Sequence, residues 1–231
     1  MNAERNYDAN EAIVMSYGLK SSAECLEDHG IVPDITLEDS SCELLVTIDD
    51  DIDKYPDDKR SILEYAGFGN SGKMQFDLVA DNEAEIDPLL LQYLRLKHIE
   101  GKDSFILEAC FNNIVWSTMA LPFSKPNEMK VMQYIIDACE LGLKNILDNK
   151  SDEKTRSGTS RSAAMARLRL QERAALQTSL RRAQDELEIL KGPDAREYYQ
   201  ERRLRELNLI RPLDESEIVL GDDRAPLSDD Y

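Results

Sequence analysis

Few residues of this chain have the types and spacing that metal chemistry needs. The 231-residue sequence contains four cysteines and two histidines. No two cysteines form a Cys-x-x-Cys pair, and only His29 and His98 could add imidazole ligands. Structural zinc sites need closely spaced thiolates and imidazoles, so this pattern predicts no metal site. Cys110 and Cys139 lie in apolar stretches and are expected to be buried thiols of a reducing compartment.

A run of aspartates is the second candidate for chemistry. It consists of residues 49–51 with Asp53, Asp57 and Asp58. A calcium loop also needs a glycine at its sharp turn and a glutamate at a fixed distance, and this run has neither. The sequence therefore predicts a solvated acidic loop.

A glycine-rich stretch, residues 67–72, has the spacing of a dinucleotide-binding loop. Such a loop lies between a strong strand and an amphipathic helix, and neither flanks this stretch, so it is predicted to be a helix-breaking turn. The chain also has no HExxH motif, P-loop or nucleophile elbow.

The charge is acidic and uneven. The net charge is −18, and residues 1–150 carry 13 Lys/Arg against 29 Asp/Glu, while residues 151–231 carry 15 against 17. This balance predicts that nucleic acid is not a partner and that a basic protein segment is one. The alternative is that the charge only keeps the chain soluble. No apolar run approaches the roughly 20 residues that span a bilayer, so no membrane association is expected.

The elements that would position these residues begin with an apolar run. Residues 12–17 suit a buried strand that ends at Tyr17, and on the residues alone Tyr17 is an ordinary strand-end tyrosine. Ser21 or Ser22 can cap a helix over residues 23–28 that Gly30 stops. Further strands are predicted at 42–48 and 74–79, with a helix over 56–65 between them.

From Asp87 onward the pattern is helical. Asp87-Pro88 marks a helix start, and broad apolar faces follow in the predicted helices 103–121 and 128–147. The inner face of the last is predicted to include Val131, Ile135 and Leu141. Three such helices need one another to hide their apolar faces, which predicts a helical bundle.

A polar linker over residues 149–162 precedes a long predicted helix over 163–190. Leu176, Leu180, Ala183, Leu187 and Leu190 form a two-heptad seam on that helix. The seam is predicted to pack against the preceding bundle, and dimerisation through it is the alternative. Residues 197–207 then form a short amphipathic helix, and residues 211–231 form an acidic flexible tail.

Residues 14–32 resemble the closing strand and helix of a SET methyltransferase domain. There a tyrosine ends an apolar strand, a Lys-Ser-Asn-Ala-Glu-Leu helix follows, and Tyr-Gly-Phe completes the segment. Here the strand ends Val14-Met15-Ser16-Tyr17, the helix reads Lys20-Ser21-Ser22-Ala23-Glu24-Cys25, and His29-Gly30-Ile31 closes it. The family's second tyrosine is thus His29, which is interpreted as a tolerated replacement.

Later segments resemble, in the same order, the substrate-binding domain of the Rubisco large-subunit methyltransferase family. The ordered set covers roughly residues 11–210. Its members are Leu90–Leu96, Phe105–Phe111 with Ile114–Trp116, Leu121–Glu128, Ile136–Cys139 and the Tyr-Tyr-Gln-Glu-Arg-Arg-Leu stretch from Tyr198 to Leu204.

The resemblance implies a fold and a division of the chain. The expected fold class is mainly α: a multihelical bundle like the substrate-binding domain of Rubisco methyltransferase, with a few short N-terminal strands from a SET-domain remnant. The expected domains are a SET remnant at 1–33, an α-helical substrate-binding domain at 34–210 with an internal linker at 149–162, and the tail at 211–231.

The resemblance also implies a function, namely binding of the protein substrate of a SET-type protein-lysine N-methyltransferase. Tyr17 matches the family's catalytic tyrosine, whose phenol helps to position and polarise the lysine amine. The complete family member uses S-adenosylmethionine, but its Gly-x-Gly cofactor loop and Asn-His-Ser motif lie upstream of this strand. No cofactor is therefore expected for this chain alone, and the fragment is expected to be inactive.

The expected partner is a protein that carries a target lysine, bound by a monomer. The alternative function is a non-catalytic acidic helical adaptor or scaffold. The Tyr-Tyr stretch looks most like chloroplast-type members, so the chloroplast stroma is the expected location, and the cytoplasm otherwise, because no transit peptide is apparent in the sequence.

Overall fold

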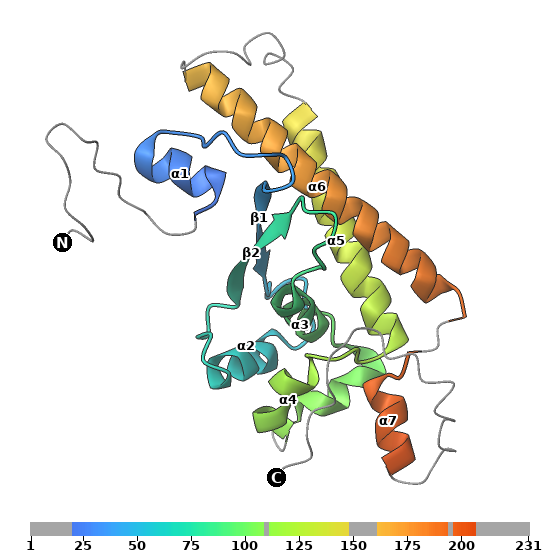
Figure 1. Cartoon of the computed structure of the whole chain (residues 1–231). Helices are drawn as coiled ribbons and strands as arrows, with labels where there is room; N and C mark the ends of the chain where they lie inside the picture. Colours follow the sequence, from blue (N-terminus) through green and yellow to red (C-terminus); the bar gives the residue numbers. More distant parts are fainter. Residues whose placement is uncertain (1–19, 109–110, 148–160, 194–195, 207–231) are drawn as a thin grey trace, which may run out of the picture.

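The computed structural model describes residues 20–108, 111–147, 161–193 and 196–206 (Figure 1). The described elements alternate between helix and strand in the first part and are helical thereafter. In chain order they are helix α1 (Ser22–His29), strand β1 (Ser41–Thr47), helix α2 (Pro56–Tyr65), strand β2 (Lys73–Val79), helix α3 (Pro88–Lys97), 3-10 helix η1 (Gly101–Leu107) and helices α4 (Asn112–Thr118), α5 (Lys125–Leu147), α6 (Arg161–Lys191) and α7 (Tyr199–Glu206).

The helix starts follow local signals in the sequence. Ser21 caps α1 in a capping box: its side chain accepts a hydrogen bond from the Glu24 backbone N–H, and the Glu24 carboxylate accepts one from the Ser21 backbone N–H. Gly30 ends α1 with a left-handed φ of 71°, a conformation that glycine adopts without steric cost. The Asp87 carboxylate accepts a hydrogen bond from the Leu89 backbone N–H and caps α3.

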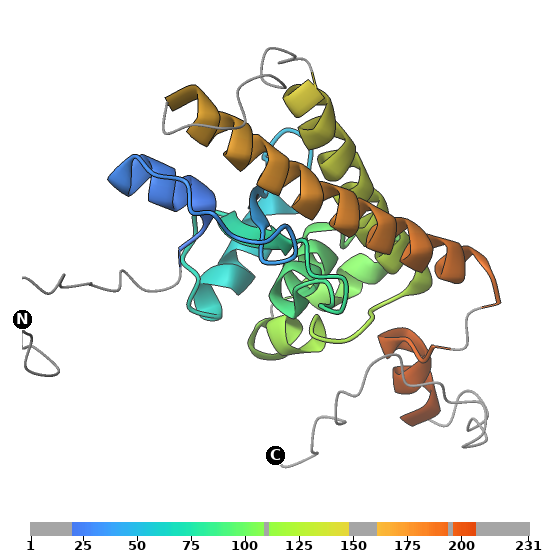
Figure 2. The same ribbon diagram turned by 45° about the horizontal axis from the view of Figure 1, so that its top comes forward.

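The two strands form a two-stranded antiparallel sheet, and the chain between them contains α2. We call this strand pair the hairpin. Their register runs from Ser41 opposite Val79 to Thr47 opposite Lys73. Alternate residues, among them Val46 and Phe76, are buried beneath the hairpin, while Leu45 on the other face is exposed. Helix α6 packs against both strands, and Figure 2 shows it crossing the hairpin with α1 beside its first half.

This hairpin corrects the predicted fold class. The sequence predicted a mainly α bundle whose few strands belonged to the N-terminal remnant, and that prediction is wrong. Both described strands lie within the segment 34–210 that was expected to be α-helical, and their side chains enter the main hydrophobic core. The physical reason is that two strands with one apolar face each bury that face against a helix as effectively as another helix would. The strand predicted at 12–17 lies outside the described residues.

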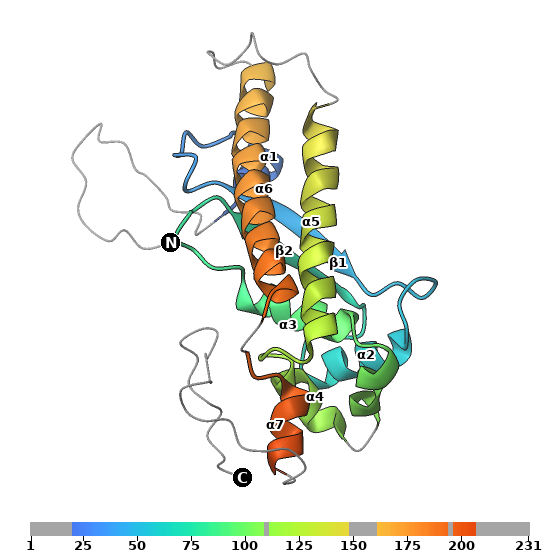
Figure 3. The same ribbon diagram turned by 90° about the vertical axis from the view of Figure 1, so that its right-hand side faces the viewer.

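Helices α5 and α6 are the two longest described helices, and they pack side by side (Figure 3). They approach closely at Gly142, where an added Cβ would lie 3.0 Å from Cδ1 of Leu176. The prediction that Leu141 faces inward is wrong: Gly142 occupies the inner position, and Leu141 is exposed. The predicted packing of the α6 seam is confirmed, because Leu176, Leu187 and Leu190 are buried within the chain.

The prediction of a single helix over residues 103–121 is wrong. The chain instead forms η1 and α4, and Glu108 between them is extended, with φ −60° and ψ 142°. The break lets Ile106 and Val115 both reach the core, whereas on one straight helix residues nine positions apart would face roughly opposite sides.

Candidate functional site

The SET-like end of the chain is described only in part. Tyr17, the residue that resemblance marks as catalytic, lies outside the described residues. The helix that follows is present as predicted, with His29 as its exposed last residue.

Side chains of α6 hold the segment that follows α1. The Arg167 guanidinium donates to the carbonyl oxygen of Val32 at 3.4 Å, and the Gln171 amide donates to that of Pro33 at 3.0 Å. A separate apolar cluster packs α1 and the segment after it against α6. It consists of Val32, Ala164 and Leu168 with Ala23 and Leu26. The SET-like segment is therefore attached directly to the long helix of the helical part.

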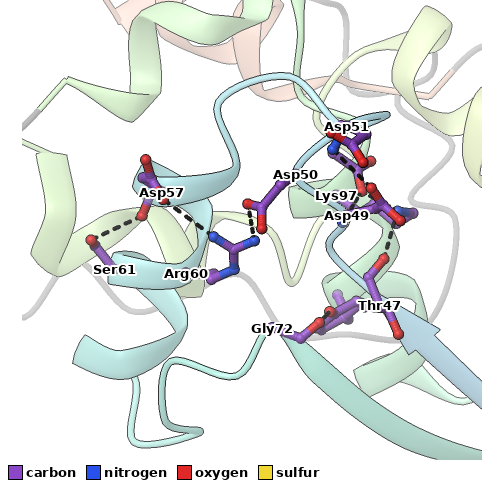
Figure 4. A network of polar contacts seen from close by, with 11 residues as sticks. Thr47, Asp49, Asp50, Asp51, Asp57, Arg60, Ser61, Gly72 and Lys97 are labelled. Carbon is purple, nitrogen blue, oxygen red and sulfur yellow. Dashed lines mark hydrogen bonds and ion pairs between the residues drawn. The ribbon is translucent and has the colours of Figure 1, made fainter.

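The aspartate run folds into a fixed loop rather than a fully solvated one. We call residues 49–58 the acidic loop. The backbone N–H of Asp49 donates to Oδ2 of Asp53 at 2.6 Å. Lys97 Nζ, from α3, donates to the same oxygen at 2.5 Å and to the carbonyl oxygen of Thr47 at 2.7 Å (Figure 4). Because the side chains of Asp53 and Lys97 are each only 8% exposed, this ion pair anchors the loop in the protein interior.

The outer carboxylates of the acidic loop are arranged around one arginine. Arg60 on α2 forms an ion pair with Asp50 and another with Asp57, the latter at 3.2 Å (Figure 4). Asp51 and Asp58 are exposed as predicted. Tyr55, just before α2, has a left-handed φ of 56°, which is uncommon for a residue with a side chain. The loop thus presents several carboxylates to solvent from a fixed backbone.

Two titratable groups lie buried behind the acidic loop. Lys59 of α2 is 1% exposed and donates from Nζ to the carbonyl oxygen of Lys97. Burial lowers the pKa of Lys59 to about 8. Burial likewise lowers the pKa of His98 to about 4, with the Lys97 charge adding to the effect. Lys59 thus supports the loop from inside and is not accessible to a protein partner.

The Gly67–Gly72 turn connects α2 to β2, as predicted. The carbonyl oxygen of Gly72 accepts hydrogen bonds from the Ile48 backbone N–H at 2.7 Å and from the Tyr93 hydroxyl at 2.6 Å. A side chain at Gly72 would contact Ile48 and Arg60, and its φ of 62° is left-handed. The glycine serves close packing between the hairpin and α3.

The final helix docks through aromatic stacking. The ring of Tyr199 stacks on Phe123, with centroids 5.2 Å apart and planes at 17°. The Tyr199 backbone N–H also donates to the carbonyl oxygen of Pro122 at 3.1 Å. The helix predicted over residues 197–207 is described as α7 from Tyr199 to Glu206, and residue 207 lies outside the described residues.

One of these features could not be read from the sequence. The anchoring pair joins Asp53 and Lys97, which are far apart in the chain, and Lys97 at the end of α3 gives no sequence signal that it is paired. Within the described ranges, no group of His, Cys, Asp or Glu could hold a metal ion. No helix in the described part of the chain is long and apolar enough to cross a membrane.

Comparison with known proteins gives the family. Residues 50–182 match the family described as Rubisco LSMT substrate-binding. The chain is 36% identical over 136 residues to the fructose-bisphosphate aldolase-lysine N-methyltransferase, chloroplastic, of Arabidopsis thaliana, covering 58% of this chain and 27% of that protein. It is 32% identical over 197 residues to the chloroplastic Rubisco large subunit N-methyltransferase of Pisum sativum, covering 83% of this chain and 38% of that protein.

Solved structures agree with this result. Rubisco LSMT bound to AdoMet superimposes with a TM-score of 0.67 at 30% identity, over 84% of this chain and 44% of that one. The SET domain of LSMT bound to methyllysine and AdoHcy gives a TM-score of 0.69 at 29% identity, over 86% and 45%. The chain spans less than half the length of these relatives. It belongs to the Rubisco LSMT substrate-binding family.

Proposed function

We propose that this chain binds the protein substrate of a SET-type, S-adenosylmethionine-dependent protein-lysine N-methyltransferase. The observation that carries the proposal is the match of residues 50–182 to the substrate-binding family, on a fold like that of LSMT. Two relatives are named for methylation of different proteins, aldolase and Rubisco. We therefore expect the partner to be a protein of that class, with a lysine as its target.

The contact between α1 and α6 supports the proposed division of the chain. Residues 1–33 would be the end of a SET domain, residues 34–210 the substrate-binding domain with its linker at 149–162, and residues 211–231 a tail. The hydrogen bonds from Arg167 and Gln171 to residues 32 and 33 fall at the proposed boundary. They would hold the SET domain in a fixed orientation to the domain that carries the substrate.

In this arrangement Tyr17 would help to position and polarise the amine of the target lysine. It precedes the capping residue Ser21 by four positions, and α1 is attached to α6.

Two surface cavities are lined entirely by described residues. One cavity, of about 360 Å³, is lined by Asn82, Gln177 and Arg181 among others, and a second, of about 260 Å³, is lined by Asp77, Asp87 and Arg182 among others. Neither cavity has an aromatic ring in its lining on which an adenine could stack. We propose that the chain alone transfers no methyl group, and that cofactor binding belongs to the complete enzyme.

We further propose that the chain acts as a monomer in the chloroplast stroma and does not bind nucleic acid. The relatives are named chloroplastic, the α6 seam is buried within the chain, and the net charge of −18 opposes binding to phosphate backbones.

Binding and methylation assays test these proposals. The purified chain, immobilised through its N-terminus, is exposed to plant Rubisco holoenzyme and to chloroplast aldolase, and labelled S-adenosylmethionine is added in a parallel assay. We expect binding to at least one protein and no methyl transfer. Binding to neither would overturn the substrate-binding proposal, and methyl transfer by the chain alone would overturn its inactivity.

A further inference from the structure

An apolar surface lies where α2 and α4 pack together. Tyr65, at the end of α2, is 71% exposed, Phe68 in the turn that follows is 39% exposed, and Ile114 on α4 is 41% exposed. The ring of Phe68 contacts that of Trp116 on α4, with centroids 5.0 Å apart. We call Tyr65, Phe68 and Ile114 the α2–α4 face.

The α2–α4 face differs from the other exposed apolar residues of the helical part. Leu141 on α5 and Ile189 on α6 are similarly exposed, but each belongs to a different long helix. Single exposed apolar side chains are common on any protein, whereas neighbouring ones with a polar rim mark interaction surfaces. Two of the three residues of the face are also aromatic, the class enriched at binding hot spots.

The rim of this face is acidic. Asp57, Asp58 and Glu64 are exposed on α2, and the part of the acidic loop that precedes α2 adds the exposed Asp50 and Asp51.

The cations of α2 do not balance this charge. Lys59 is buried, and Arg60 is already engaged by two carboxylates, so Lys54 of the acidic loop is a single exposed cation against the carboxylates of the rim. The charge that remains therefore favours a partner that combines basic and apolar side chains.

The acidic rim is also held rigidly. The buried pair of Lys97 and Asp53 fixes the acidic loop, and Lys59 ties α2 to the end of α3. A surface that is ordered before binding loses less conformational entropy when the partner arrives.

We propose that the α2–α4 face and its acidic rim dock a basic, partly apolar segment of the protein substrate, away from the target lysine. The proposal rests on the proposed function for the identity of the partner. Helix α1, which would continue the SET domain, lies at one end of the molecule, and α2 and α4 lie at the other (Figures 1 and 3). The face would act as an exosite that holds the substrate protein while its lysine reaches the active site.

The charge disfavours two other occupants. A second copy of the chain would place one acidic rim against another, and nucleic acid would bring phosphates to carboxylates. A basic protein segment is the occupant that matches both the apolar centre and the charged rim.

The first test uses a defined probe. A synthetic peptide that alternates lysine and leucine is titrated into isotope-labelled chain, with a glutamate–leucine peptide of equal length as control. We expect amide shifts in α2, the Gly67–Gly72 turn and α4 with the lysine peptide, and weaker binding as salt is added. Shifts centred elsewhere, or equal binding of the acidic peptide, would overturn the proposal.

Matched variants give the second test. The triple change Tyr65→Ser, Phe68→Ser, Ile114→Ser should weaken peptide binding about tenfold or more. The control, Leu141→Ser with Ile189→Ser, removes similarly exposed apolar groups from α5 and α6 and should change affinity less than twofold. Equal losses in the two variants would contradict the proposal, provided that circular dichroism shows both to be folded. Sedimentation velocity in the same buffer should show that the wild type and the triple variant are both monomers. A wild-type dimer that the triple change dissociates would contradict the proposal.

The same variants separate this inference from the proposed function. If the lysine peptide binds the face but neither Rubisco nor aldolase binds the chain, the assigned substrate class fails and the docking face stands. If Rubisco or aldolase binds the wild type and the triple variant equally well, the docking face fails and the proposed function stands.

Discussion

Arg95 and Glu128 form a buried two-point ion pair that joins α3 to the first turn of α5. Nε of Arg95 lies 2.7 Å from Oε1 of Glu128, and Nη2 lies 3.0 Å from Oε2. The two side chains are 5% and 1% exposed. Arg95 Nη1 also donates to the carbonyl oxygens of Met119 and Ala120. The guanidinium therefore satisfies the carbonyl groups of the segment that follows α4.

Breaking this pair from one side should destabilise the whole domain. Glu128→Gln removes the negative charge and leaves the Arg95 guanidinium buried without a counter-charge, which we expect to cost about 3–5 kcal/mol of unfolding free energy. Urea denaturation followed by circular dichroism measures the loss. The double change Arg95→Met, Glu128→Leu should lose less than Glu128→Gln alone, because no charge is left buried. A loss below about 1 kcal/mol in Glu128→Gln would show that the pair is not buried as described.

Lys59 should make stability depend on pH in the alkaline range. Its folded pKa of about 8 lies below the ordinary 10.5, so between these values the unfolded chain binds a proton that the folded chain has lost. Unfolding free energy therefore rises with pH across this window, and the burial penalty is fully present below pH 8.

Replacing Lys59 with methionine removes that penalty. Relative to the wild type, Lys59→Met should be more stable at pH 7 by up to about 3 kcal/mol, and the difference should shrink toward pH 10.5. Urea midpoints of both proteins across this range provide the measurement. A constant difference between them would mean that Lys59 does not titrate in the folded state as described.

Tyr199 should hold α7 locally rather than stabilise the whole domain. Tyr199→Ala removes the stacking on Phe123, which we expect to speed amide hydrogen exchange in α7 about tenfold while leaving exchange in α5 unchanged. Tyr65→Ala, which truncates a highly exposed tyrosine, is the matched control and should leave α7 exchange unaltered. Equal acceleration in both helices would show that α7 is part of the global folding unit.

The contact between α1 and α6 should depend on the small apolar cluster there. Leu168→Ala removes its largest buried side chain and should release α1, so that exchange in α1 rises by tenfold or more, the result of a loss of about 2 kcal/mol. Leu141→Ala on the exposed face of α5 serves as control. If α1 exchanges at the same rate in the variant and the wild type, α6 does not hold the SET-like segment.

Local signals in the sequence were sufficient to predict most of the elements. Capping at Ser21 and Asp87, proline at the start of α2 and alternation in both strands depend only on near neighbours, and all are confirmed. The predictions that were wrong concern contacts between residues far apart in the sequence. The hairpin was seen as strands but assigned to the wrong domain, because only the tertiary structure shows that α6 covers it.

The polar contacts of the acidic loop could likewise not be predicted in full from the sequence. Aspartates at 50, 51, 57 and 58 remain at the surface as their composition suggests, yet Asp53 turns inward to Lys97 from another helix. No periodicity links these two positions. The α2–α4 face could not be predicted either, because Phe68 contacts Trp116 of α4 only when their two segments pack.

Competition with an intact relative tests the central claim most directly. Methylation of Rubisco by the pea large-subunit methyltransferase, and of aldolase by the Arabidopsis enzyme, is measured with increasing amounts of this chain. If the chain binds the protein substrate, the KM for at least one substrate protein rises while kcat stays constant, and methylation of a short lysine peptide is unaffected. Unchanged KM for both proteins, at chain concentrations well above those of the substrates, would contradict the account.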